Sequence, residues 1–178
     1  EKEIAFYKMF TSHNLPHFVE GSSKPTPSIT TSLLKGETPG FLDQMEAGLL
    51  SHKDFIRIRE ALFNIQNLPR TSLLVHADLA PHNIYLTDNR VVIADWDSYF
   101  YIKDIKYRVY DFAFLWASLD FNEEHLINIF NQEFIDLKMR GLINDFTFCY
   151  KKRLSVIEKY GAKYQTGLTL RKEILRLI

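Results

Sequence analysis

The chain has 178 residues, 46% of them hydrophobic and 14% aromatic, a composition that excludes a disordered chain and fits one domain or two small lobes. Lysine plus arginine equals aspartate plus glutamate at 22 each, so the charge gives no argument for a nucleic-acid partner. The single cysteine, Cys149, excludes an intramolecular disulfide and suits a reducing, cytoplasmic location, and no apolar run approaches the roughly 20 residues that span a membrane.

The first third of the chain is predicted to begin with a helix and two strands. Apolar residues recur at helical spacing over 1–11, and short β-type runs follow at 17–21 and 28–34. Residues 41–50 are predicted to be helical. The next helix starts at a pattern that resembles a capping box, S-H-K-D. It carries an apolar stripe that we expect in the core: Phe55, Ile58, Leu62 and Ile65.

The most informative stretch follows, L-V-H-A-D-L-A-P-H-N-I-Y-L-T-D-N-R-V-V-I-A-D-W-D, at residues 74–97. Its β-type runs at 84–86 and 91–94 are separated by an Asp-Asn turn signal, which predicts a hairpin. That hairpin would bring Asn83 and Asp95 close together. Carboxylates and an amide gathered at strand ends suit a hard cation such as Mg²⁺, which prefers oxygen ligands.

The polar residues of this stretch have the order and spacing of a kinase catalytic loop. Protein kinases carry H-R-D-L-x-x-x-N and then D-F-G, and this chain carries H-A-D-L-A-P-H-N and then A-D-W-D. In kinases the first aspartate accepts the proton of the attacking hydroxyl, and the asparagine and second aspartate hold the metal ions. The resemblance implies that Asp78 is the catalytic base and that Asn83 and Asp95 bind Mg²⁺. It also implies that His76 supports the loop.

The departures from protein kinases point to small-molecule kinases. Ala77 replaces the arginine used in activation-loop control, no A-P-E follows, and Asp111 comes soon after Asp97. In these features the chain resembles the aminoglycoside phosphotransferase and choline kinase family, whose members show H-G-D-L-x-P-x-N-I, then I-D-W-E or I-D-F-E, then Y-D-L-A. The resemblance implies that Asp111 is buried and braces the loop through backbone amides, with Asp97 as a further supporting residue. Ala80 departs from the histidine or lysine often found there.

The resemblance implies an α+β, protein-kinase-like fold with a mostly helical C-terminal lobe, a catalytic β-hairpin and the end of an N-terminal β lobe. We expect residues 1–35 to be a remnant of the nucleotide-binding lobe and 36–178 to form the catalytic and substrate-binding lobe. The hinge, whose backbone would hold the adenine of ATP, is placed near Ser32 and Leu34. No glycine-rich loop is present in the chain. A fragment, a lost lobe and a degenerate family member all remain open explanations.

The last third of the chain is predicted to be helical after an irregular link. The link, 98–110, is expected to line the substrate side, and a very apolar helix follows at 112–119. Further helices are predicted around 126–137, at 146–160 with K-K-R on its surface, and after Gly167. In the family, these C-terminal helices shape the acceptor pocket. Three acidic residues could attract a cationic amine or be ordinary first-turn charges: Asp120, Glu123 and Glu124.

Three functions are compatible with these patterns. The first is an ATP-dependent phosphotransferase, with ATP and Mg²⁺ as cofactors. It would move the γ-phosphate to a hydroxyl of a small molecule that is aminoglycoside-like, choline-like, homoserine-like or a sugar alcohol. The second is a non-catalytic kinase-like binding module without a complete nucleotide site, which the missing glycine-rich loop and Ala80 favour. The third is a metal-dependent hydrolase that uses His76, Asp78 and His82, although no established metal-ligand spacing supports it.

Overall fold

The computed structural model describes five parts of the chain: residues 40–66, 72–86, 91–120, 122–160 and 167–178. The predicted remnant of the nucleotide-binding lobe and the hinge at Ser32 and Leu34 lie outside the described residues. The described part is α+β, as expected, with long helices and small antiparallel sheets. None of its helices is long and apolar enough to cross a bilayer.

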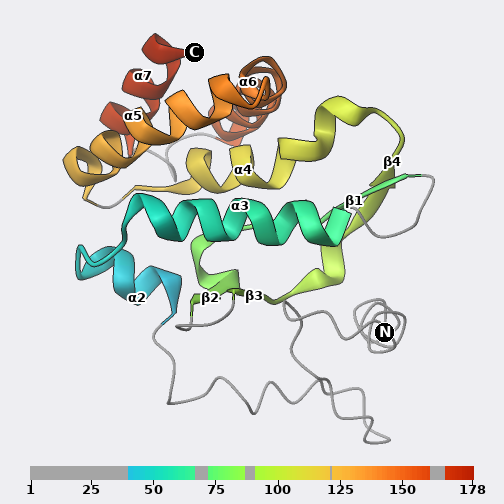
Figure 1. Cartoon of the computed structure of the whole chain (residues 1–178), viewed down its shortest axis with the longest axis horizontal. Helices are drawn as coiled ribbons and strands as arrows, with labels where there is room; N and C mark the ends of the chain where they lie inside the picture. The colour runs from blue at the N-terminus through green and yellow to red at the C-terminus, as the bar shows by residue number, and fades with distance from the viewer. Residues whose placement is uncertain (1–39, 67–71, 87–90, 121, 161–166) are drawn as a thin grey trace, which may run out of the picture.

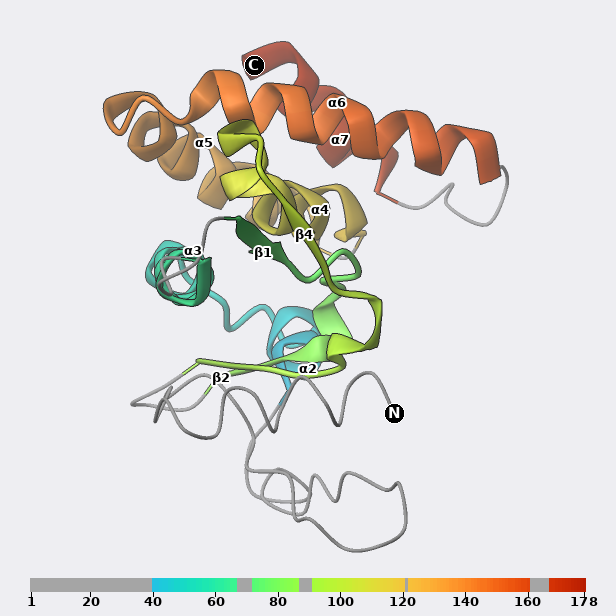
Figure 2. The ribbon, with the colours of Figure 1, turned by 90° about the vertical axis from the view of Figure 1, so that its right-hand side faces the viewer.

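The helices and strands keep the labels of Figure 1. The helices are α2 (Phe41–Glu46), α3 (His52–Gln66), α4 (Tyr110–Ser118), α5 (Glu123–Met139), α6 (Ile143–Tyr160) and α7 (Leu168–Leu177). The strands are β1 (Leu73–Val75), β2 (Ile84–Leu86), β3 (Val91–Ile93) and β4 (Phe100–Ile102). In both views, α5, α6 and α7 lie on one side of α4, and α2 lies with the β2–β3 hairpin on the opposite side (Figures 1 and 2).

Two antiparallel strand pairs frame the predicted site. In the β2–β3 hairpin Ile84 lies opposite Ile93, which confirms the predicted hairpin. The other pair joins β1 to β4, with Leu74 opposite Tyr101. The prediction of an irregular link over 98–110 was therefore wrong for β4. Its β-type residues find a partner strand far back in the chain, a pairing that local sequence does not reveal.

Helix α4 forms the centre of the hydrophobic core. All its residues from Asp111 to Ala117 are buried, as expected for a helix that is apolar all round. Trp116 stacks on Phe55 of α3, with ring centroids 4.4 Å apart, and meets Phe130 of α5 edge-on at 4.8 Å. The predicted apolar stripe of α3 is confirmed as core, since its four members are almost completely buried. The helices are thus assembled around α4.

Two helices, α2 and α5, end at a glycine. At the end of α5, Gly141 has a φ of 67°, and the N–H of Leu142 donates to Leu137 O at 2.8 Å, which is a Schellman motif. The same arrangement ends α2, where Gly48 has a φ of 67° and Leu49 N–H donates to Gln44 O at 2.9 Å. The predicted helix over 41–50 is therefore too long, because Gly48 stops it at Glu46.

The first turn of α5 and the start of α7 hold the C-terminal helices together. Glu123 accepts the Leu170 N–H at 2.7 Å, so its carboxylate stabilises the start of α7. Arg171 Nε donates to Ala117 O at the end of α4, at 3.0 Å. Gly167 precedes α7 with a φ of 75°, and a Cβ at this position would lie 2.5 Å from Leu119 O. Only glycine fits this close approach of two backbones.

Replacing Gly167 with alanine should destabilise the fold more than the same change at Gly141. Both residues have positive φ, which costs an alanine about 1–2 kcal/mol. Only Gly167 adds a clash, because a Cβ at Gly141 would meet nothing within 4 Å. We expect Gly167→Ala to lower the free energy of unfolding by about 3 kcal/mol or more in urea titrations. Equal losses for the two variants would contradict the packing of α7 described here.

Candidate functional site

The site is built on the loop from β1 to β2 and on the turn that follows β3. Asn83 ends the 3₁₀ turn Pro81–Asn83 and accepts the Ala94 N–H at 2.9 Å through its backbone carbonyl. Asn83 and Asp95 therefore lie at the same, open end of the hairpin, as the sequence predicts. The Asn83 side chain is buried and its Nδ2 donates to Asp78 O at 3.1 Å, which links the loop to the hairpin.

His76 is a buried structural residue of this loop. Its Nε2 lies 2.8 Å from Ala94 O, and its Nδ1 lies 3.2 Å from the Asp78 nitrogen. A carbonyl oxygen only accepts and a backbone N–H only donates, so Nε2 donates to Ala94 O and Nδ1 accepts the Asp78 N–H. The ring also packs against Trp96, with centroids 4.5 Å apart. Both nitrogens are thus used, which argues against His76 as a zinc ligand in the hydrolase hypothesis.

Asp111 braces the loop from the start of α4. Its side chain is 1% exposed, and its two carboxylate oxygens accept the N–H groups of His76 and Ala77 at 2.8 and 2.9 Å. The expectation of a buried aspartate bound to backbone amides is confirmed. Burial raises the pKa of Asp111, and the two N–H bonds oppose that shift. Ala77 has a φ of 74°, which explains why glycine suits this position in the family that the motif resembles.

Two further aspartates of the motif expose their carboxylates. Asp78 is exposed directly after the braced residues, and Asp95 is exposed after β3. Asp95 has a left-handed backbone, with φ 62° and ψ 61°, which aspartate tolerates better than most residues. Strained backbone of this kind is concentrated at functional sites. Asp97 lies in the 3₁₀ turn Trp96–Ser98, and its supporting role stays a prediction.

A pocket of about 390 Å³ opens beside Asp78. Its lining comes from the loop between β1 and β2, from α2, from α4 and the residues after it, and from α6: Leu42, Asp78, Ala80, Pro81, His82, Phe114, Ser118, Asp120 and Arg153. The volume suits a small organic molecule. Asn83 and Asp95 are not part of this lining, and neither is the 98–110 link, which the sequence placed on the substrate side.

The pocket residues of α4 and α6 were not predicted from the sequence. Phe114 and Ser118 are four residues apart, a spacing that places them on one helix face, but the helix was interpreted only as core. Arg153 was predicted to lie on the surface with its two lysine neighbours. It is only partly exposed, and its guanidinium carbon lies 3.6 Å from the centroid of the Phe114 ring. Arg108, which precedes α4, pairs with Asp145 of α6 at 2.9 Å.

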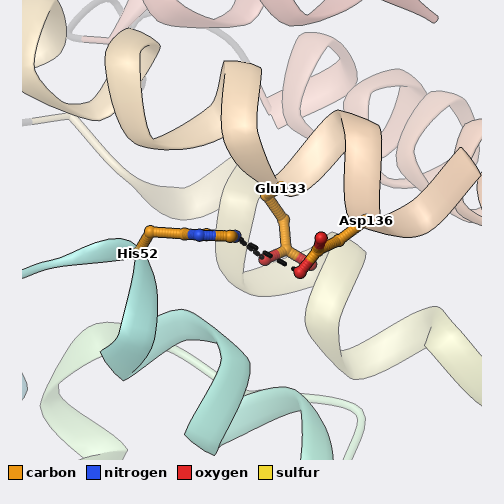
Figure 3. Close-up of side chains that lie close together, drawn as sticks. All are labelled: His52, Glu133 and Asp136. Carbon is orange, nitrogen blue, oxygen red and sulfur yellow. Dashed lines mark hydrogen bonds and ion pairs between the residues drawn. The ribbon is translucent and has the colours of Figure 1, made fainter. Parts of the chain in front are cut away.

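A second cluster of charged residues joins α3 to α5 (Figure 3). His52, Glu133 and Asp136 have side-chain atoms within 4.8 Å of one another, the one such group found among the described residues. Arg59 is completely buried, contacts Glu133 and lies 3.4 Å from Asp136, so a guanidinium already pairs with both carboxylates. Burial lowers the pKa of His52, and its Nε2 lies 3.1 Å from Glu133. We interpret this cluster as a structural ion-pair network.

Replacing Asp111 with asparagine should disturb the loop and destabilise the fold. Asparagine offers one acceptor oxygen and places an NH₂ group against the second backbone N–H. The buried, unsatisfied N–H should cost about 2–4 kcal/mol in the free energy of unfolding. Asp145→Asn is the matched control, because it removes a partly exposed pair worth at most about 1 kcal/mol. Similar denaturant midpoints for both variants would contradict the bracing role.

Comparison of the chain with protein-family models, with curated proteins and with solved structures finds no match. The resemblance to small-molecule kinases therefore depends on the motif residues and on the geometry of the loop, the hairpin and the pocket.

Proposed function

We propose that the chain carries the catalytic lobe of an ATP-dependent phosphotransferase with a protein-kinase-like fold, which moves the γ-phosphate to a hydroxyl of a small molecule. The position of Asp78 is the main support for this proposal. Its carboxylate borders a pocket of about 390 Å³, while the loop that holds it is fixed on one side by Asp111 and on the other by Asn83. A base must be both held and accessible, and Asp78 is both.

In this proposal Asp78 orients the acceptor hydroxyl and takes its proton. Phosphoryl transfer depends mainly on positioning and on electrostatic stabilisation, so a rigid loop matters more than an unusual pKa. The rigidity comes from hydrogen bonds to His76 and Ala77 just before Asp78, and from the Asn83 bond to the Asp78 carbonyl itself. The pocket walls from α4 and α6 would then hold the acceptor against this carboxylate.

The residues at the open end of the hairpin suit Mg²⁺ and the phosphates of ATP. The Asn83 amide nitrogen is engaged with the Asp78 carbonyl, so the amide oxygen Oδ1 is the atom that would bind a cation. Asp95 adds an exposed carboxylate, and both are the hard oxygen ligands that Mg²⁺ prefers. When bound, Mg²⁺ neutralises charge on the transferring phosphoryl group. The adenine contact expected at Ser32 and Leu34 belongs to the same proposal.

Asp78→Asn should abolish transfer and leave nucleotide binding largely intact. The change removes the proton acceptor but keeps the size of the side chain, so we expect a loss of about 10²–10⁴-fold in turnover. The assay is acceptor-dependent ADP formation from MgATP with a panel of amino alcohols, hydroxy acids, sugar alcohols and aminoglycosides. Asp104→Asn is the control, because Asp104 is exposed and only caps a 3₁₀ turn.

Two results would count against the proposal in different ways. Unchanged turnover in Asp78→Asn would remove Asp78 as the base. Binding of MgATP by the wild-type protein without ADP formation from any acceptor would instead favour the non-catalytic binding module.

A further inference from the structure

The pocket beside Asp78 carries charges of both signs. Asp78 and Asp120 contribute carboxylates, and Arg153 is the one lysine or arginine among the described residues that line it. A pocket that selected a cationic amine would be expected to present carboxylates without a competing guanidinium. The arginine therefore bears on which acceptor the pocket takes.

Arg153 is held in a defined position by an aromatic ring. Its guanidinium carbon lies 3.6 Å from the centroid of the Phe114 ring, which is a cation–π contact. Arg153 and Phe114 both line the pocket that Asp78 borders.

An arginine guanidinium is well suited to bind an oxyanion. Arginine presents its donors as a rigid fork that matches a carboxylate or a phosphate with two parallel hydrogen bonds. Stacking on Phe114 reduces the side-chain freedom that such binding would otherwise remove. The positive charge of Arg153 also acts on Tyr110. Burial raises the pKa of Tyr110, and Arg153 opposes that shift.

We propose that Arg153 is a specificity-determining residue and that the acceptor carries an anionic group, a carboxylate or a phosphate, in addition to its hydroxyl. Arg153 binds the anionic group while Asp78 faces the hydroxyl. The inference rests on the proposed phosphotransferase function, because only a phosphotransferase has an acceptor for the phosphate. The binding preference itself is independent of turnover, because it concerns only the contacts of the pocket.

The test is direct binding of four three- to five-carbon probes to the full chain by isothermal titration calorimetry. Glycerate carries a carboxylate, glycerol 3-phosphate a phosphate, glycerol no charge and choline a positive charge. We expect at least one of the two anions to bind about 10-fold or more tightly than glycerol and than choline. The comparison of glycerate with glycerol 3-phosphate decides between carboxylate and phosphate.

Variants at Arg153 assign the preference to one side chain. Arg153→Gln should weaken binding of the preferred anion by about 10- to 100-fold and leave glycerol binding unchanged. Lys151→Gln removes an exposed positive charge two residues away on α6 and should leave both affinities unchanged. Should Arg153→Gln fail to fold, Arg153→Lys decides: it keeps the charge without the fork, and we expect it to reduce the anion preference.

The inference is overturned if neither anion binds more tightly than glycerol, if choline binds most tightly, or if variants at Arg153 leave the anion preference unchanged. Its failure is distinguishable from failure of the proposed function. Arg153-dependent anion binding without phosphate transfer would remove the phosphotransferase and keep the anion site. Transfer to neutral or cationic acceptors that is unchanged in Arg153→Gln would keep the phosphotransferase and remove the anion site.

Discussion

The contact between the Asp111 carboxylate and two backbone N–H groups is the constraint on which the candidate site depends. It spans from the first turn of α4 to His76 and Ala77, and it is almost completely shielded from water. A carboxylate in such a place is stable only when hydrogen bonds replace its lost hydration. Here those bonds also hold Ala77 at a φ of 74°, and Asp78 follows directly. The same two hydrogen bonds thus offset both the cost of burying Asp111 and the strain at Ala77.

The same helix connects the brace to the pocket. Asp111, Phe114 and Ser118 are separated by three and four residues, which places them along one face of α4. The helix is otherwise fixed by the aromatic core around Trp116. Movement of α4 would therefore shift the loop and the pocket wall together. This arrangement explains how a short 3₁₀ turn and two small sheets can hold polar groups in a reproducible geometry.

Patterns in the sequence predicted the hairpin and the buried Asp111, but they did not predict the walls of the pocket. The hairpin that brings Asn83 and Asp95 to one end follows from two β-type runs around a turn, and the burial of Asp111 was expected from the family resemblance. Contacts between distant segments had no such signal. The pairing of β4 with β1 and the stacking of Arg153 on Phe114 join parts of the chain that lie 25 residues or more apart. Only the packed structure shows that Arg153 is partly buried and lines the same pocket as Asp78.

Paramagnetic relaxation by Mn²⁺ would show whether a cation binds at Asn83 and Asp95, as we propose. Mn²⁺ substitutes for Mg²⁺ at oxygen-rich sites and broadens nearby amide resonances. In the presence of ATP, we predict selective broadening at Asn83, Asp95 and their immediate neighbours, which Asp95→Asn should remove. Broadening centred on His52 and Asp136, or spread evenly over the acidic residues, would rule out a cation site at Asn83 and Asp95.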